Sequence, residues 1–315
     1  MRSQRPDPAV IFAFSLFVVL LALNLATNPA TFGTGNLGAT IGLAAPMILA
    51  SMAVTPAFLV GNGGIDLSVG PLMGLTNAVI VMGLVQNDIT SPLVVVLVAL
   101  GIGGVVGLIN GLIVSYVRIQ PIVATLGTYL SLAGLTIVIA PTPGGNVPPW
   151  LSDLATRNST WIIVATLLVW FLVVRSRPFF DNLMATAGDE RAAYTSGVNT
   201  ARVRVAAFTL SGILGGIAGL GLTAVLGSVD PTLGPRYTLT GLAAAALGGV
   251  SVAGGRGGMS RAVLGGLILF LLENLLTYVR VSSFLLQVVF GLVLVVAVSA
   301  NGLFSRRNKA AEEAI

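Results

Sequence analysis

Few side chains in this sequence could carry out chemistry. Histidine and cysteine are both absent, which excludes thiol nucleophiles, disulfides and the usual zinc or haem ligands. A serine nucleophile needs an acidic or basic partner, and the long apolar stretches offer little besides Asp66 and Glu273. We therefore predict that the chain is not an enzyme and has no catalytic residue, no metal site and no cofactor of its own.

The same inventory excludes nucleotide binding by a P-loop. The only lysine is Lys309, near the end of the chain, and there is no G-x-x-x-x-G-K-[ST] motif to build a phosphate-binding loop. Any ATP that drives this protein must therefore be bound by a partner subunit.

Asp66 ends the segment Gly61-Asn62-Gly63-Gly64-Ile65-Asp66, which interrupts an apolar pattern. Its glycines permit unusual backbone angles, and the carboxylate can accept hydrogen bonds from the amides that open the next helix. A charge near the membrane core costs about 2.5 to 3.5 kcal/mol unless it is satisfied. Two roles stay open for Asp66, namely capping a re-entrant turn and gating the inner end of a transport path.

Glu273 is the one carboxylate placed well inside a predicted span, with Asn274 beside it and Arg280 two turns along. An acid inside a membrane indicates function, but it could equally pair with a neighbouring helix for assembly. Other polar residues in the apolar stretches could contact a passing polar molecule or bond a neighbouring helix. These further candidates for the translocation path are Ser68, Asn77, Asn110, Thr125, Thr128 and Gln287.

The elements that must position these residues are membrane helices. The chain is 55% hydrophobic and 9% charged, with a mean hydropathy of +0.97, whereas soluble domains are about one quarter charged. A membrane β-barrel would show alternating segments of about ten residues, and none is visible. The net charge of +5 comes from basic residues that flank apolar runs, which indicates membrane topology and contact with lipid, not nucleic-acid binding.

The apolar runs predict an all-α, polytopic membrane protein with about ten transmembrane helices. We place them at 8–27, 38–60, 69–86, 93–115, 121–140, 161–175, 205–226, 238–253, 262–279 and 284–300. The first run could instead be a secretory signal peptide, but it is long for that role. With both termini in the cytoplasm, 13 of the 16 basic residues lie on the cytoplasmic side, and the exceptions are Arg157, Arg236 and Arg280. This bias supports both the helix count and the orientation.

Two short segments recur in the second half of the chain. The segment 65–71, IDLSVGP, is echoed by 229–235, VDPTLGP, and the segment 116–119, YVRI, is echoed by 278–281, YVRV. In the predicted topology the two members of each pair lie on opposite sides of the membrane. We therefore predict one permease domain over 1–315, made of inverted five-helix repeats at 1–140 and 141–304 and a cytoplasmic tail at 305–315. Such repeats place the transport path at their interface.

Small residues at four-residue spacing predict close helix contacts, because lipid supplies no hydrophobic drive between helices. One such stripe is Gly103, Gly107 and Gly111, and another is Ser211, Gly215 and Gly219 with Gly212 and Gly216 beside them. A third is Gly241, Ala245 and Gly249. We interpret these stripes as packing faces.

Eight charged residues gather in the stretch 175–204, which must stand in water between the two halves. Within a predicted cytoplasmic loop at 178–203, the residues from Gly188 to Gly197 indicate a two-turn helix with Asp189 as its N-cap and Gly197 in a left-handed terminating conformation. Asn199 or Thr200 would cap the following span. A short helix held between two spans is rigid, so a force on it would move both spans together. The simpler alternative is that this stretch is only a connector in water.

Here the sequence resembles a known family. Gly188-Asp189-Glu190-Arg191-Ala192-Ala193, with Ser196-Gly197-Val198-Asn199, is similar to the cytoplasmic coupling loop of bacterial ABC-importer permeases of the ribose, xylose and autoinducer-2 type, relatives of the branched-chain amino acid permeases. Three further parts of the chain resemble the same family and occur in the same order. They are 63–70, then 110–111 with 121–128, and then 247–251 with 254–257. The resemblance covers roughly residues 36 to 300.

This resemblance implies several partners. It implies a second permease, identical or a sister chain, two ABC nucleotide-binding subunits, and a periplasmic or lipoprotein sugar-binding protein, all at the bacterial inner membrane. The coupling residues would be Gly188, Asp189, Glu190, Arg191, Ala192, Ala193, Ser196 and Gly197. The expected function is monosaccharide import driven by a partner ATPase. Import of branched-chain amino acids by the same architecture and an ion-coupled secondary transporter are the alternatives.

Overall fold

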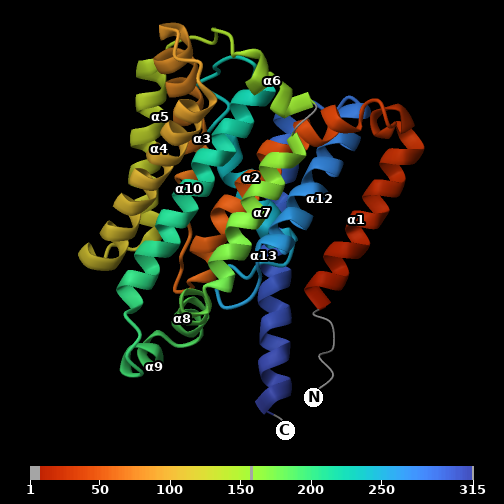
Figure 1. The fold of residues 1–315 in the computed structure, drawn as a ribbon. Coiled ribbons are helices and arrows are strands. Elements are labelled where there is room, and N and C mark those ends of the chain that lie inside the picture. Colours follow the sequence, from red (N-terminus) through yellow and green to blue (C-terminus); the bar gives the residue numbers. More distant parts are fainter. Residues whose placement is uncertain (1–7, 157–158, 314–315) are drawn as a thin grey trace.

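The computed structural model describes residues 8–156 and 159–313 (Figure 1). Arg2, Arg5 and Arg157, which entered the topology argument, and residues 314 and 315 of the predicted tail lie outside these ranges. The described chain is helical apart from loops and one isolated antiparallel bridge between Gly144 and Val229. The all-α prediction is confirmed for this part of the chain.

Each predicted helix coincides with an observed one. The first half contains α1 (Pro8–Thr27), α2 (Leu37–Leu59), α3 (Val69–Ala78, continued by short π and 3-10 turns to Asn87), α4 (Pro92–Leu112, continued by a π turn to Val117) and α5 (Pro121–Ile139). The second half contains α6 (Pro149–Thr156), α7 (Ser159–Arg175), α8 (Arg177–Gly188), α9 (Glu190–Thr195), α10 (Thr200–Leu226), α11 (Arg236–Leu247), α12 (Met259–Tyr278) and α13 (Ser283–Glu313).

Not all of these helices are long enough to span a bilayer unaided. Within the described ranges, seven helices have the length and apolar character of a membrane span, or eight if α7 and α8 form one bent span. The helix α11 has only 12 residues. The apolar part of α13, Phe284–Ser299, is also short. Length and composition therefore establish a multi-span membrane protein.

One predicted boundary was wrong. The helix expected at 238–253 ends at Leu247, because Gly249 adopts a left-handed φ of 90° and the chain turns back so that the Val250 amide bonds the Ala245 carbonyl at 3.0 Å. The segment 178–203 is largely helical, since it holds α8, α9 and the start of α10. Figure 1 shows α8 and α9 at the end of the bundle where α13 finishes and α1 begins.

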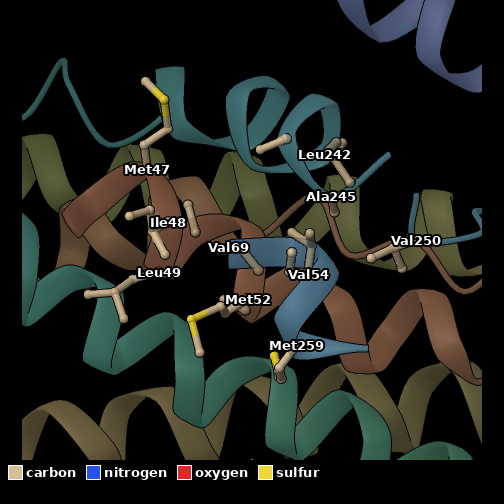
Figure 2. Close-up of a cluster of buried hydrophobic side chains, with 14 of the residues drawn as sticks. Met47, Ile48, Leu49, Met52, Val54, Val69, Leu242, Ala245, Val250 and Met259 are labelled. Carbon is tan, nitrogen blue, oxygen red and sulfur yellow. The ribbon is translucent and has the colours of Figure 1, made fainter. Parts of the chain in front are cut away.

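The central helix is α2, with a continuous buried stretch from Ala44 to Leu59. Side chains of Met47, Ile48, Leu49 and Met52 on α2 belong to a buried cluster in the core, in which Leu49 lies against α10 (Figure 2). Burial on all sides is expected for a helix enclosed by other helices. This helix therefore holds one end of the segment 60–68, which contains Asp66.

The echoed sequence segments have the same local structure. Asp66 Oδ1 accepts hydrogen bonds from the Ser68 amide at 3.0 Å and from Ser68 Oγ at 2.6 Å. Asp230 Oδ1 accepts from the Thr232 amide at 2.9 Å and from Thr232 Oγ1 at 2.7 Å. In the second pair, Arg118 and Arg280 both take a left-handed φ, 62° and 61°.

The starts of α3 and α11 meet closely. A Cβ added to Gly234 would lie 2.6 Å from the Cα of Gly74, and one added to Gly70 would lie 2.6 Å from the amide nitrogen of Thr238. Thr238 Oγ1 donates to the Leu67 carbonyl at 3.1 Å. The two helices that follow the echoed turns are thus in direct contact.

Glycines let α4 and α10 approach each other. A Cβ added to Gly107 would lie 2.3 Å from the Phe208 carbonyl oxygen, and one added to Gly103 would lie 2.2 Å from that of Gly212. The first two predicted packing faces are confirmed, with one refinement, whereas Gly249 of the third lies beyond the end of α11. Gly212 and Gly216 contact α4, whereas Gly215 and Gly219 contact α3 on another face of α10.

We predict that Gly107→Ala destabilises the permease, because its new methyl group meets the backbone of α10. Overpacking of this kind costs about 1 to 3 kcal/mol. The matched control is Gly101→Ala on the same helix, where an added Cβ meets nothing within 4 Å. Thermal unfolding in detergent should show a lower midpoint for Gly107→Ala only, and equal midpoints would contradict the packing of α4 on α10.

Candidate functional site

Asp66 lies at the centre of a buried polar network and is only 1% exposed. Besides the two bonds from Ser68, its Oδ2 accepts a hydrogen bond from Ser211 Oγ on α10 at 2.9 Å. A buried carboxylate is tolerated when such bonds replace its hydration. The predicted bond to an amide at the opening of α3 is confirmed, because the Ser68 amide belongs to the residue that precedes α3.

The network continues into α4 and α5. Asn110 Nδ2 donates to Ser68 Oγ at 2.9 Å, and Thr128 Oγ1 donates to Asn110 Oδ1 at 2.6 Å. Thr125 Oγ1 accepts from the Leu67 amide at 3.2 Å. Five of the path or gate candidates, namely Asp66, Ser68, Asn110, Thr125 and Thr128, therefore come together around the segment 60–68.

This network holds chain segments together and offers little to a cargo. Asp66, Ser68, Asn110 and Thr125 are at most 1% exposed, and each of their side chains already has a partner within the described structure. Bonds from α4, α5 and α10 thus converge on one short non-helical segment. A movement of that segment must move these three helices or break their hydrogen bonds.

Ser211 was not among the predicted site residues. It stands in a stripe of small residues, which indicated helix packing. Its partner Asp66 is 145 positions away, so no local pattern reveals the contact. The only feature of the sequence that could have indicated it is that a serine stands in a stripe made otherwise of glycines.

Asn77 lies apart from this network. Its Nδ2 donates to Thr223 Oγ1 at 3.2 Å and to the Ser228 carbonyl at 3.0 Å, and its Oδ1 accepts from the Asp230 amide at 3.3 Å. Asn77 therefore anchors the second of the echoed turns, as Asn110 supports the first.

Glu273 and Asn274 also lie apart. Glu273 borders a cavity of about 400 Å³ between α5, α11, α12 and α13. Asn274 Oδ1 is buried and has no hydrogen-bond partner among the described residues. Arg280 follows the end of α12 and is exposed, and the only ion pair found within the described ranges joins Arg204 and Glu190. The pairing of Glu273 with a charged neighbour is not observed there.

The short helix α9 has the caps that the sequence predicts. Asp189 Oδ1 accepts from the Ala192 amide at 2.9 Å, and Gly197 has a φ of 90°. Asn199 Oδ1 accepts from the Arg202 amide at 3.0 Å and caps α10. Tyr194 is 70% exposed, whereas Ala193 is buried. The helix is therefore fixed at both ends and presents one face outward.

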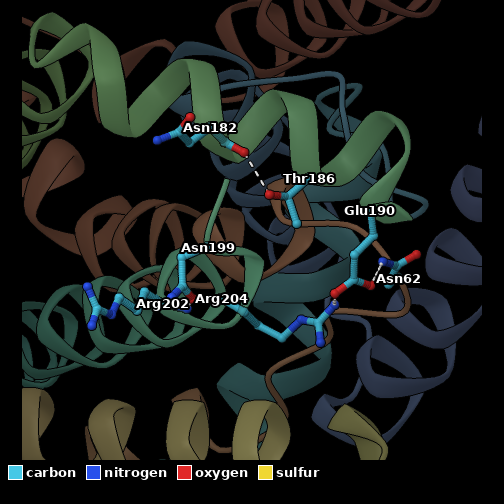
Figure 3. Close-up of polar contacts among 7 residues, drawn as sticks. All are labelled: Asn62, Asn182, Thr186, Glu190, Asn199, Arg202 and Arg204. Atoms are coloured by element: carbon cyan, nitrogen blue, oxygen red, sulfur yellow. Dashed lines mark hydrogen bonds and ion pairs between the residues drawn. The ribbon is translucent and has the colours of Figure 1, made fainter. Parts of the chain in front are cut away.

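Glu190 joins α9 to two distant parts of the chain (Figure 3). Its Oε1 forms an ion pair of 2.8 Å with an Nη atom of Arg204 on α10. Its Oε2 accepts a hydrogen bond of 2.5 Å from Nδ2 of Asn62, which has a left-handed φ of 51°. Asn62 lies four residues before Asp66. We call these three side chains, Glu190, Asn62 and Arg204, the Glu190 clamp.

Backbone contacts reinforce the clamp. A Cβ added to Gly61 would lie 3.0 Å from the Cα of Ala187 on α8, and one added to Gly254 would lie 2.3 Å from the Cα of Gly61. The Gly255 amide bonds the Leu59 carbonyl at 3.3 Å. The start of the segment 60–68 is thus enclosed by α8 and the loop after α11.

An open cavity of about 990 Å³ lies beside the clamp. Asn62, Arg118, Tyr194 and Arg204 are among the residues that line it. In the described residues no group of three or more acidic side chains could hold a metal ion. The arrangement around α9 therefore provides an open polar face, with no candidate metal centre among the described residues.

Comparison with known proteins places the chain in a family. A family model described as branched-chain amino acid transport system / permease component matches residues 36–298. The ribose import permease protein RbsC of Haemophilus influenzae is 32% identical, with 92% of each chain covered, and that of Escherichia coli is 33% identical over 89% of this chain and 90% of its own. The D-allose transport system permease protein AlsC of Escherichia coli is 29% identical over 93% and 91%. No solved structure matches significantly. The match covers most of the chain, and this protein belongs to the permease-component family of branched-chain amino acid transport systems.

Proposed function

We propose that this chain is the membrane-spanning permease subunit of an ATP-driven importer for a monosaccharide in the bacterial inner membrane. The observation that carries the proposal is its similarity, over about nine tenths of each chain, to relatives named as ribose and D-allose permeases. ATP is bound by two ABC nucleotide-binding partner subunits, because this chain has no P-loop. The remaining partners are a second permease and a periplasmic or lipoprotein sugar-binding protein.

The proposed architecture has ten spans in two inverted repeats, at 1–140 and 141–304, with both termini and the tail 305–315 in the cytoplasm. Two observations support it. The turns at Asp66 and Asp230 have matching hydrogen bonds, and the helices α3 and α11 that follow them touch at their starts. Inverted repeats with interrupted helices are a common plan for transporters.

In this proposal α9 receives the mechanical work of ATP hydrolysis. The residues from Gly188 to Gly197 form its contact surface, and Arg191 and Tyr194 on that helix are exposed. The Glu190 clamp then carries the displacement to Asn62 and hence to the segment that holds Asp66. The buried network passes it on to α4, α5 and α10. Asp66, Ser68, Asn110, Thr125 and Thr128 thus act as a mechanical joint and do not bind the cargo.

Two alternatives differ in cargo or in energy source. The family description names branched-chain amino acids, and a shared fold does not fix the substrate. An ion-coupled transporter would need titratable or ion-coordinating groups in the core, and the carboxylate of Asp66 is already occupied by three hydrogen bonds.

We predict that proteoliposomes with the permease, its ATPase and its binding protein take up a monosaccharide only when ATP is available to the ATPase. A proton or sodium gradient alone should drive no uptake, because the energy source lies on the partner subunit. Radiolabelled D-ribose, D-allose and L-leucine are compared with and without ATP. Gradient-driven uptake, or uptake of L-leucine alone, would overturn the proposal.

We predict that Glu190→Ala uncouples ATP hydrolysis from transport. Loss of a partly exposed ion pair and its second hydrogen bond weakens the clamp by about 1 kcal/mol, which corresponds to roughly a fivefold loss of uptake per ATP hydrolysed. ATP hydrolysis by the assembled complex should continue. The control is Asp181→Ala on α8, an exposed acid outside the clamp. Equal uptake per ATP in both variants would exclude a transmitting role for Glu190.

A further inference from the structure

A second polar site lies at the cavity between α5, α11, α12 and α13. Glu273 lies in the last two turns of α12 and Gln287 in the first two turns of α13. Tyr129 of α5 and Tyr237 of α11 complete the polar lining, with Arg236 at the start of α11. At about 400 Å³, the cavity is at the small end of the range for ligand pockets, about 300 to 1,000 Å³.

Five polar side chains of this cavity are unpartnered within the described structure. The side chains of Arg236, Glu273 and Gln287 make no hydrogen bond or ion pair with any described residue, and neither do the hydroxyls of Tyr129 and Tyr237. The network around Asp66 is different, because its members already have partners. The cavity beside Glu273 therefore has free hydrogen-bonding capacity.

Free polar groups between membrane helices call for a polar occupant. Lipid cannot hydrogen-bond them, and an intramembrane acid without a partner is costly. The carboxylate of Glu273 only accepts, the guanidinium of Arg236 only donates, and the amide of Gln287 does both. Tyr129 and Tyr237 add rings that are apolar over their faces and polar at the tip. Sugar hydroxyls can both donate and accept, and the carbon-bound hydrogens of a sugar ring fit an aromatic face.

We propose that this cavity is a monosaccharide-binding subsite of the permease itself, with Glu273 and Gln287 as hydroxyl ligands. The inference rests on the proposed function and adds that the cargo is held briefly by this chain on its way through. Met47, Leu233, Leu239, Leu286 and Phe290 supply the apolar remainder of the wall. Arg236 is exposed and lies at the rim, while Glu273 is partly buried.

The test is saturation-transfer NMR on the whole permease in nanodiscs, with D-ribose, D-allose and L-leucine as probes. We expect saturation of a sugar by the wild-type protein, weakened about tenfold by Glu273→Gln, since a neutral amide is a weaker hydrogen-bond acceptor than a carboxylate. Gln287→Leu, at an exposed residue of the cavity lining, should weaken it as well. Asp153→Asn is the matched control, an exposed carboxylate on α6 outside the cavity.

Uptake in proteoliposomes separates this inference from the proposed function. The two cavity variants should lose sugar uptake while binding-protein-stimulated ATP hydrolysis stays at the wild-type rate, which a merely destabilising change would not allow. If the wild-type complex imports sugar but both variants bind and import it normally, the subsite is wrong and the importer stands. If the complex imports only L-leucine, both the subsite and the proposed cargo fail.

Discussion

The structure depends on satisfying one buried carboxylate, that of Asp66. Inside a membrane no water can replace missing hydrogen bonds, so a charged group must find its partners within the protein. Asp66 does so through Ser68 in its own segment and Ser211 on α10. Ser68 is in turn held by Asn110 on α4. This one carboxylate thereby fixes the position of a non-helical segment relative to the helices around it. The helices α3, α4, α10 and α11 also approach one another closely at glycines.

A fixed segment can also transmit force. Asn62 lies at one end of it, next to α8 and in the Glu190 clamp, while Asp66 lies at the other end in the core. The Glu190 clamp is partly exposed, whereas the network around Asp66 is buried. The clamp is therefore the weaker of the two connections. In our account, work done on α9 reaches the helices through these hydrogen bonds. In our account the cavity at Glu273 is separate from this route, which leaves its polar groups available to a cargo.

The sequence predicts the local features well and the distant contacts poorly. Apolar runs locate the helices because membrane spans need continuous apolar surface, and Asp189, Gly197 and Asn199 are recognisable because caps act within a few residues. The contact between Asn62 and Glu190 and the contact between Asp66 and Ser211 cannot be predicted in this way, since the partners are 128 and 145 positions apart. The end of α11 was misplaced because Gly249 stands in an apolar stretch that reads as continuing helix. The gathering of five polar residues around Asp66 could not be predicted from the sequence, because the fold brings together residues from separate helices.

The central claim is that the contact between α9 and Asn62 carries the displacement, and the absence of cysteine in the chain permits a direct test. The double variant Asn62→Cys with Glu190→Cys removes the clamp and places the only two thiols at its ends. Uptake per ATP hydrolysed is measured before and after joining them with a short bis-methanethiosulfonate linker. The account predicts loss of coupling in the unlinked protein and its recovery on linking. Coupling that is normal without the linker, or that stays lost with it, would contradict the account.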